Sequence, residues 1–316
     1  GGVCDSIKKL YPKEPSLEWL DGLSIIRHRI GLLNGFLRDQ RDGYLRARIS
    51  GITNTLRVQH KEIVNLPRSD RKYAEPVRGS LICEDDEVLI GADQSSLEDR
   101  LKQHFIYPFD PEYVKEMNVE GYDPHLSLAL LAKKVTTQQV EDYKSGVDKS
   151  IKPIRDVFKN GNYACQYNAY PPRLAITCGI SLDEARKLFK VYWEKNKAIK
   201  EVVKTLKVKE VDGELWQYNP VSKFWYNLRS TNDQFSTLVQ GTASYVFDLW
   251  LSFVLRERPQ LTATFHDEVC LVVKEYEIEK VKNLLVIAND AVNKELKLNR
   301  ELSVGIQVGK RYSEVH

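Results

Sequence analysis

The sequence predicts an α+β fold in which a helix-rich segment is inserted into a discontinuous sheet. A short apolar run at 87–93 ends on an acidic residue, two short strands are expected within 261–273, and another strand at 302–308. Helical periodicity covers 138–167 and 181–206, between the first strand and the others. The strands must therefore pair across a long insertion, which is typical of a mixed α+β domain.

The remaining segments fit the same prediction. Residues 17–47 keep an apolar period near 3.6, with interruptions expected at Gly31 and Gly35. Residues 211–228 alternate and are rich in turn residues, so we expect a hairpin that turns at 218–221. Further helices are expected at 97–104, 126–133, 235–255 and 278–296.

Composition excludes several classes of protein. The five cysteines are scattered and form no Cys-x-x-Cys pair, which argues against a disulfide framework or a structural zinc site and for a reducing compartment. No continuous apolar run approaches the ~18 residues of a membrane span, so we expect a soluble, cytoplasmic protein without a membrane partner. The net charge of +3 suits a nucleic-acid partner without demanding one.

A stripe of cations and phenols is predicted on one helix, at 154–168. Arg155, Lys159, Tyr163 and Tyr167 recur every four residues, so a helix would place them on one face. At ~1.5 Å per residue the stripe is about 18 Å long, roughly the reach of a nucleoside triphosphate. The alternative is a solvated amphipathic helix whose basic face has no function.

Two aspartates that are far apart in the sequence, Asp93 and Asp267, both lie at ends of predicted strands. Asp93 ends one strand, and Asp267 lies at the tip of the hairpin His-Asp-Glu. Carboxylates that meet repel one another, and a divalent cation is the usual remedy. The alternative is that Asp93 caps the following helix and Asp267 merely forms a turn.

Taken in order, these three features resemble motifs A, B and C of family A DNA polymerases, the family of bacterial polymerase I and of many phage replicative polymerases. The likeness runs from about residue 51 to the C-terminus and is closest to the phage branch. It implies a right-hand polymerase fold with an antiparallel-sheet palm, helical fingers and a truncated helical thumb. The expected parts are a partial thumb or lead-in at 1–60, palm at 61–130 and 235–316, and fingers at 131–234.

The segment from Asp93 to Arg100 resembles motif A, Asp-x-Ser-x-x-Glu-x-Arg. The resemblance implies that Asp93 is a catalytic metal ligand, that the carbonyl of Gln94 is another ligand, and that Glu98 is the gate that excludes a ribose 2′-hydroxyl. Asp99 stands where the family usually has an apolar residue.

The cationic helix resembles motif B, and Asp-Pro-His at 123–125 resembles the family's Asp-Ile-His. The likeness implies that Arg155 contacts the γ-phosphate of a deoxynucleoside triphosphate (dNTP) and that the catalytic Lys159 contacts its α- or β-phosphate. Tyr163 and Tyr167 would lie against sugar and base, and His125 near the triphosphate.

The hairpin tip resembles motif C. By that likeness Asp267 is the second metal ligand, Glu268 an auxiliary catalytic acid, and His266 a residue near the primer terminus. The metal would be Mg²⁺, two ions in all, with Mn²⁺ as a possible substitute.

Contacts to primer-template DNA are implied for a further group of residues. Gln240, in Gln-Gly-Thr-Ala, resembles the residue that reads the minor groove, although Ser236 replaces the expected Asn. Arg57 and Asn65 resemble residues that bind the primer-template. Asn168 replaces the usual Gly after motif B, and because Asn tolerates left-handed backbone, a helix end is still expected there.

The resemblance therefore predicts a DNA-directed DNA polymerase of phage replication. The family usually carries a proofreading exonuclease and a long thumb, and about fifty residues precede the likeness, so we expect a split or truncated enzyme of low processivity. Its partner would be a separate exonuclease or thumb subunit or a processivity factor. The alternatives are a single-subunit RNA polymerase and a non-catalytic nucleic-acid-binding protein on the same scaffold.

Overall fold

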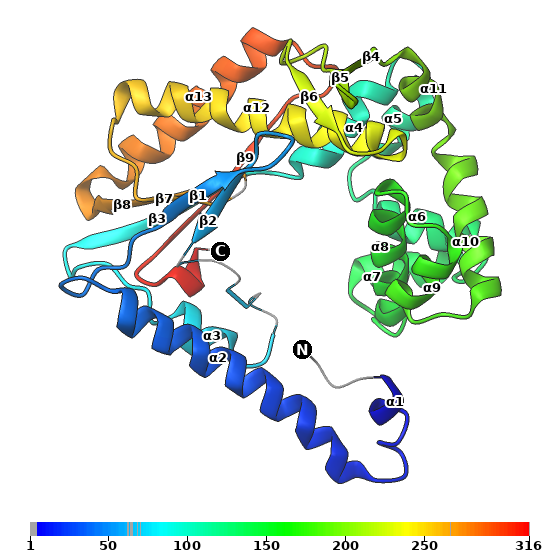
Figure 1. Cartoon of the computed structure of the whole chain (residues 1–316), viewed down its shortest axis with the longest axis horizontal. Coiled ribbons are helices and arrows are strands. Elements are labelled where there is room, and N and C mark those ends of the chain that lie inside the picture. Colours follow the sequence, from blue (N-terminus) through cyan, green and yellow to red (C-terminus); the bar gives the residue numbers. More distant parts are fainter. Residues whose placement is uncertain are drawn as a thin grey trace.

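The protein consists of a helix-covered antiparallel sheet, a separate group of helices, and two smaller sheets (Figure 1). The computed structural model describes residues 5–61, 63, 66–67, 69, 71–265 and 267–315. Its α-helices are α1 Asp5–Lys8, α2 Trp19–Asp39, α3 Ala74–Arg78, α4 Leu97–Ile106, α5 Pro111–Met117, α6 Pro124–Leu131, α7 Thr137–Ser145, α8 Lys152–Gln166, α9 Pro171–Cys178, α10 Leu182–Lys195, α11 Lys197–Thr205, α12 Gln234–Glu257 and α13 Ile278–Leu296. Its strands are β1 Arg48–Ile52, β2 Val58–Lys61, β3 Glu87–Gln94, β4 Val208–Val211, β5 Glu214–Tyr218, β6 Trp225–Leu228, β7 Ala263–Phe265, β8 Glu268–Lys274 and β9 Val304–Gly309.

The central sheet joins strands from both ends of the sequence. Its order is β7-β8-β3-β9, and all neighbouring strands are antiparallel. The expected pairing across a helical insertion is therefore confirmed, and so is the α+β class. The pairing brings the residue at the end of β3 beside the turn that precedes β8.

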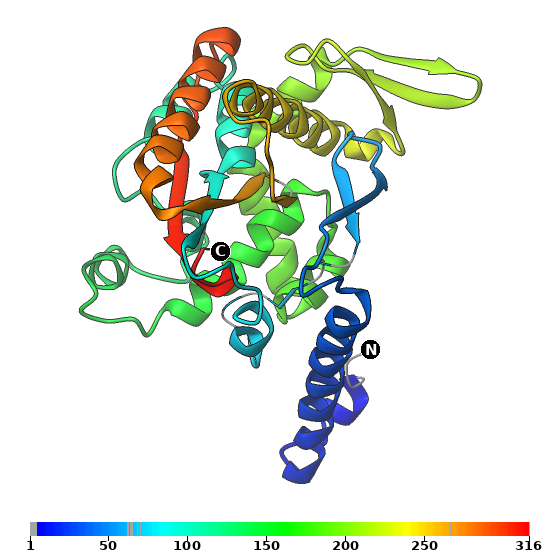
Figure 2. The ribbon, with the colours of Figure 1, turned by 90° about the vertical axis from the view of Figure 1, so that its left-hand side faces the viewer.

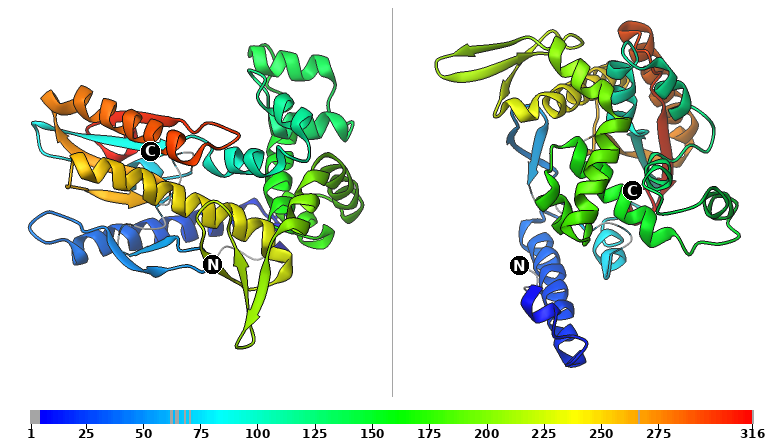
Figure 3. Two further views of the ribbon diagram at one scale, coloured as in Figure 1. Left: turned by 90° about the horizontal axis from the view of Figure 1, so that it is seen from above. Right: turned by 90° about the vertical axis from the view of Figure 1, so that its right-hand side faces the viewer.

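Two long helices, α12 and α13, cover one face of this sheet and run side by side (Figure 3). Trp250 of α12 is fully buried, and its indole Nε1 donates a hydrogen bond to the carbonyl of Leu285 in α13, at 3.0 Å. Buried apolar residues of β3, β8, α4 and α5 complete this core. The helices thus hold the sheet rigidly from one side and leave its other face to other elements.

A second core lies among the inserted helices α6, α8, α9 and α10. Phe158 and Cys165 of α8, Leu174 of α9 and Tyr192 of α10 are buried in it. Helix α9 is not among the elements expected from the sequence. The opposite face of α8 remains available for polar contacts.

Helix α2 projects from the rest of the molecule (Figure 2). The expected interruption at Gly31 and Gly35 is wrong, because α2 is a single helix from Trp19 to Asp39. One glycine in a helix costs only about 1 kcal/mol, so a continuous apolar stripe can carry the helix through both. The segment after it forms the β1–β2 hairpin.

The segment 208–228 forms a three-stranded sheet, β4-β5-β6, that also projects from the body (Figure 2). The expected turn near residue 218 is present as the connection between β5 and β6. A second hairpin was missed, between β4 and β5, where Asp212 and Gly213 have φ values of 53° and 77°. Asp-Gly with two positive φ angles is the signature of a two-residue hairpin turn.

Among the residues that the structure describes, one helical segment, Thr231–Glu257, which contains α12, is long and apolar enough to cross a membrane by length and composition alone. The expectation drawn from continuous apolar runs overlooked it, because polar residues are interspersed along it. Half of its most apolar 18-residue stretch is buried inside the protein, and α12 packs against α13 and α4. We therefore interpret α12 as the central core helix of the sheet.

The buried contact between α12 and α13 gives a prediction for stability. Trp250→Ala should lower the free energy of unfolding by about 3–5 kcal/mol, because it leaves a cavity and removes the indole hydrogen bond to α13. Trp250→Phe should cost less, since most of the volume remains. Denaturant titration measures both, with Ile287→Ala, 65% exposed on α13, as the control. Equal effects of Trp250→Ala and Ile287→Ala would contradict the assignment of this core.

Candidate active site

Alternation along β3 decides where its last side chains point. Its even-numbered residues between 88 and 92 belong to the core under α12 and α13, whereas Leu89 belongs to a small cluster on the opposite face. Because successive side chains of a strand point to opposite faces, Asp93 lies on the face of Leu89, away from the two long helices. Gln94 points the other way, is 1% exposed, and donates to Asn289 of α13 at 3.4 Å. Only the main chain of Gln94 is therefore available to the site.

The strand register brings the two predicted aspartates together. Asp93 pairs with Glu268 of β8 on one side and with Gly305 of β9 on the other. Asp267 immediately precedes β8, and its carbonyl accepts a hydrogen bond from the amide of Gln94 at 3.3 Å. Helix α4 has Ser96 as its N-cap, so the alternative that Asp93 caps this helix is wrong.

The carboxylates of this edge form an acidic pair. Partial burial raises the pKa of Asp93, and the nearby charge of Asp267 raises it further. Glu268 lies beside them and is 3% exposed. A methyl group at Gly305 would come within 2.9 Å of Asp93 Oδ1, so the glycine leaves room for the carboxylate.

This donor set fits a hard cation bound partly by the protein. Within the described ranges, no group of three or more His, Cys, Asp or Glu side chains could hold a metal ion. A site with two aspartates and a main-chain carbonyl suits Mg²⁺, which keeps several waters and shares its remaining ligands with substrate phosphates. Burial and then the charge of Asp267 raise the pKa of Asp93, and a bound cation would favour the ionised carboxylates that both effects oppose.

Helix α8 carries the predicted stripe. Arg155, Lys159 and Tyr163 lie outside the stripe that buries Phe158 and Cys165, and Tyr167 is the C-cap residue. Asn168 follows with φ 59°, so the expected left-handed end of the helix is confirmed. The four residues therefore follow one face of α8 from its first turn to its end.

Arg155 is already engaged by an acidic partner. Its Nε donates to Asp123 Oδ2 at 2.6 Å, while Asp123 Oδ1 accepts from the amides of His125 and Leu126, each at 2.9 Å. Burial opposes ionisation of Asp123, but the Leu126 amide and Arg155 prevail and lower its pKa. An anion that binds Arg155 must therefore share or displace this carboxylate.

His125, in the first turn of α6, contacts α8 beside the stripe. Its ring centroid is 5.7 Å from that of Tyr163, and its Nδ1 is 3.2 Å from Nδ2 of Asn162. Burial lowers the pKa of His125 to about 4; the charge of Asp123 opposes this shift, and the charges of Arg155 and Lys159 add to it. The imidazole is consequently neutral near pH 7.

Glu98 connects three distant segments. Its Oε1 lies 3.4 Å from the Arg57 guanidinium, and its Oε2 accepts a hydrogen bond from the Tyr167 hydroxyl. Burial raises the pKa of Tyr167, the Glu98 charge raises it further, and the side chain of Gln240 lies within hydrogen-bonding reach. Four of the predicted residues thus meet at the start of α4, while Asn65 and His266 lie outside the described residues.

The sequence matches DNA polymerase family A over residues 46–314. The chain belongs to this family. No curated protein matches the chain.

Among solved structures, the POL domain of Pol1 from M. smegmatis, in complex with DNA primer-template and dNTP, is similar to this family A chain, with a TM-score of 0.79 and 19% identity. The match covers 99% of this chain and 57% of that one. At this identity the likeness supports the polymerase fold.

Asp99, which departs from the family pattern, interacts with other side chains of α4. Asp99 Oδ2 accepts from Gln103 Nε2 at 2.8 Å. One turn along α4, Lys102 is 3% exposed; burial lowers its pKa to about 8, and the charge of Asp99 partly offsets this. Lys102 Nζ lies 5.9 Å from the Tyr192 ring centroid of α10. The i, i+3 spacing of Asp99 and Lys102 was a signal in the sequence that these two charges lie near each other.

Sequence reasoning missed two other residues of this region, Asn162 and Gly305. Asn162 contacts His125 from the same helix as Tyr163. Gly305 lies opposite Asp93 on β9. The apolar residues of this segment predicted the strand but did not single out the glycine. Their roles follow from contacts between distant elements, for which a single sequence carries no signal.

The neutral state of His125 predicts a pH dependence of stability. Its folded pKa, about 4, lies below its ordinary value of 6.5, so the unfolded chain binds a proton first as the pH falls. This residue should therefore reduce stability as the pH falls from 6.5 toward 4. Denaturation of wild type and His125→Gln across this range should show the smaller loss in the variant. Parallel profiles would refute the burial of a neutral imidazole.

Proposed function

We propose that the chain catalyses template-directed DNA synthesis, in which a primer 3′-hydroxyl attacks the α-phosphorus of a dNTP and pyrophosphate leaves. The observation that carries this proposal is the pairing of Asp93 and Asp267 at one edge of the sheet, with the register fixed by β3 and β8. Membership of DNA polymerase family A supports the same conclusion.

Asp93, Asp267 and the carbonyl of Gln94 would hold two Mg²⁺ ions, for which Mn²⁺ could substitute. When bound, the ions would lower the pKa of the attacking hydroxyl and neutralise the charge of the departing pyrophosphate. The protein contributes a fixed carboxylate pair whose mutual repulsion favours cation binding. Glu268, buried beside Asp93, would act as the auxiliary acid.

The triphosphate would lie along α8. Arg155 would contact the γ-phosphate, exchanging all or part of its bond to Asp123, and Lys159 the α- or β-phosphate. His125, neutral near pH 7, can donate a hydrogen bond without adding charge. These groups orient the phosphates and offset the negative charge that develops in the transition state.

Tyr163 and Tyr167 would support the sugar and base of the dNTP. A hollow of about 580 Å³ between α8 and α9, which Tyr167 and Asn168 help to line, offers space for the templating base. Glu98, tethered by Arg57 and Tyr167, would press against the sugar and exclude a 2′-hydroxyl. This tether favours a DNA polymerase over the RNA polymerase alternative.

Primer-template DNA would contact Gln240 and Arg57 near Glu98, together with Asn65 and His266. Most of these contacts would read the backbone and the minor groove, so that specificity comes from the template. We also propose the palm at 61–130 and 235–316, the fingers at 131–234 and the partial thumb at 1–60.

The likeness of the motifs to the phage branch supports a role in phage DNA replication, in the cytoplasm of a host cell. The chain spans 57% of the polymerase chain that it matches. A separate exonuclease or thumb subunit, or a processivity factor, is the partner we propose.

The metal site gives the decisive test. Asp267→Asn and Asp93→Asn should each reduce primer extension in Mg²⁺ by more than about 100-fold, since losing even an outer-shell partner of a metal costs 10–100-fold. DNA binding, measured by fluorescence anisotropy, should persist. The matched control is Asp290→Asn, an exposed residue of α13. Extension by either site variant at the wild-type rate would contradict the proposed metal site, whereas absence of extension by wild type would support a non-catalytic nucleic-acid-binding protein instead.

The proposed role of Glu98 predicts how the protein discriminates ribonucleotides from deoxyribonucleotides. Glu98→Ala should raise the efficiency of ribonucleotides relative to deoxyribonucleotides by about 10- to 100-fold, because the added hydroxyl then finds space. Glu98→Gln keeps the volume and can still accept from Tyr167, so it should stay selective. Single-turnover incorporation of each nucleotide measures the ratio. If both variants lose selectivity equally, the charge of Glu98 and not its bulk would be responsible.

A further inference from the structure

Asn162, in the second half of α8, contacts the buried ring of His125. Its side-chain Nδ2 lies 3.2 Å from Nδ1 of His125, which is 8% exposed in the first turn of α6. The next residue along α8, Tyr163, contacts the same ring, with ring centroids 5.7 Å apart. Two consecutive side chains of α8 thus fix the position of one imidazole.

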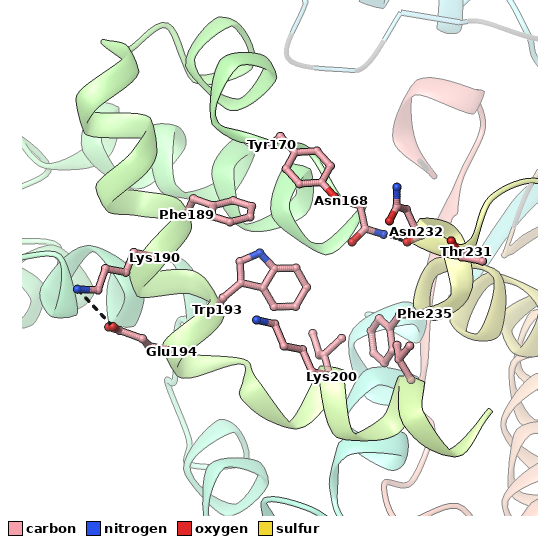
Figure 4. A pocket seen from close by; sticks show the side chains of 12 residues that line it. Asn168, Tyr170, Phe189, Lys190, Trp193, Glu194, Lys200, Thr231, Asn232 and Phe235 are labelled. Carbon is pink, nitrogen blue, oxygen red and sulfur yellow. Dashed lines mark hydrogen bonds and ion pairs between the residues drawn. The ribbon is translucent and has the colours of Figure 1, made fainter.

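Polar contacts at both ends of α8 define where Asn162 lies. In the first turn, Arg155 Nε donates to Asp123, the N-cap of α6, at 2.6 Å. Just beyond the last turn, the side-chain amide of Asn168 donates to the carbonyl of Asn232, in the segment before α12 (Figure 4). Asn162 follows Arg155 by seven residues, or two helical turns, and so lies on the same face of α8. This is the face along which the triphosphate is proposed to lie.

The contact between Asn162 and His125 determines which ring nitrogen carries the proton. A neutral imidazole has one N–H and one nitrogen with a free lone pair, whereas an amide nitrogen can only donate. Because Nδ1 of His125 faces Nδ2 of Asn162, it must accept, and the proton is then on Nε2. Within the described part of the chain, Nε2 has no hydrogen-bond partner of its own. The fold therefore leaves this N–H unused.

The surroundings of His125 make the place of this proton important. Burial lowers its pKa to about 4; Asp123 beside α6 and Asp99 of α4 oppose this shift, while Arg155 and Lys159 of α8 add to it. Near pH 7 the ring therefore carries a single proton. Ionised phosphate oxygens only accept hydrogen bonds, so a ring with Nε2–H can bind one. A ring with its proton on Nδ1 would turn a lone pair toward the same oxygen.

From this geometry we propose that Asn162 is a positioning residue, which keeps the proton of His125 on Nε2 and so directs one N–H at the triphosphate. The inference rests on the proposed polymerase function. It gives Asn162 a part in nucleotide binding that acts through His125 and needs no contact with the nucleotide. A residue that merely held α6 against α8 would leave the place of the proton open.

The first test locates the proton in the free protein by NMR. The chain is labelled with ¹⁵N in its six histidines, and His125→Gln identifies the signals of His125. At neutral pH, wild type should show a hydrogen bonded to Nε2 and none on Nδ1. Asn162→Asp should move the proton to Nδ1 or protonate both nitrogens, because a carboxylate only accepts. A wild-type ring with its proton on Nδ1 would overturn the inference, and so would an unchanged pattern in Asn162→Asp.

The second test measures dNTP affinity against pH. For Asn162→Asp, the dNTP dissociation constant relative to wild type should rise about tenfold between about pH 6 and about pH 9, the loss expected for one hydrogen bond to a charged acceptor. The imidazolium of this variant loses the Nε2 proton as the pH rises and keeps the proton beside the carboxylate. Using the ratio cancels the titration of the triphosphate itself. Single-turnover incorporation at varied dNTP concentration gives each constant separately from the maximal rate, which should change less.

Two further variants separate positioning from a structural role. Asn160→Asp adds the same charge at an exposed site of α8, and its ratio to wild type should not change with pH. His125→Gln has no titratable ring, so adding Asn162→Asp to it should give a ratio to His125→Gln that is independent of pH. A pH-dependent ratio in that double variant, or a constant ratio in Asn162→Asp alone, would contradict the inference. If wild type extends no primer, the proposed function fails, while the NMR test still decides where Asn162 places the proton.

Discussion

The candidate active site depends on the register between β3 and β8. This register runs from Glu87 opposite Lys274 to Asp93 opposite Glu268, and a slip of one residue would turn Asp93 into the core. Repulsion between two carboxylates about 4 Å apart is roughly 1 kcal/mol in water and about 4 kcal/mol near a protein surface. Each fully buried apolar side chain in the two strands contributes about 1.5–3 kcal/mol, and several are present. Burial of apolar residues therefore outweighs the repulsion and holds the acidic pair in place before any cation binds.

Helix α8 is anchored differently, in a core of its own. It packs with α6, α9 and α10, while its links to the sheet domain include polar contacts from Tyr167 to Glu98 and from Asn168 to Asn232. Trp193 of α10 packs against both cores. A few solvent-accessible hydrogen bonds open at much lower free energy than a packed core. We therefore expect the polar links between the helix group and the sheet domain to open more readily than either core.

Periodicity predicted the elements that bury a regular face, and it failed where local chemistry or distant packing decides. Helix α13 has the expected bounds, and α8 lies within two residues of them, since apolar positions recur at helical spacing. The break expected at Gly31 and Gly35 is absent, because propensity alone seldom ends a long amphipathic helix. Burial of Lys102 beside Asp99 depends on Tyr113 of α5 and Tyr192 of α10, which cover it from other parts of the chain. The carboxylate pair, by contrast, could be predicted because motif order constrains which strands must meet.

The structure changes how the cationic stripe should be understood. A sequence presents Arg155 as a free cation, whereas the folded chain pairs it with Asp123 at 2.6 Å. If a triphosphate binds Arg155, Asp123 still accepts hydrogen bonds from the two backbone amides at the start of α6. Its carboxylate is therefore not left without hydrogen-bond partners. His125 is neutral and cannot replace the lost positive charge. Phosphate binding in the proposed reaction is therefore an exchange of partners at Arg155, and it couples arrival of the nucleotide to the contact between α6 and α8.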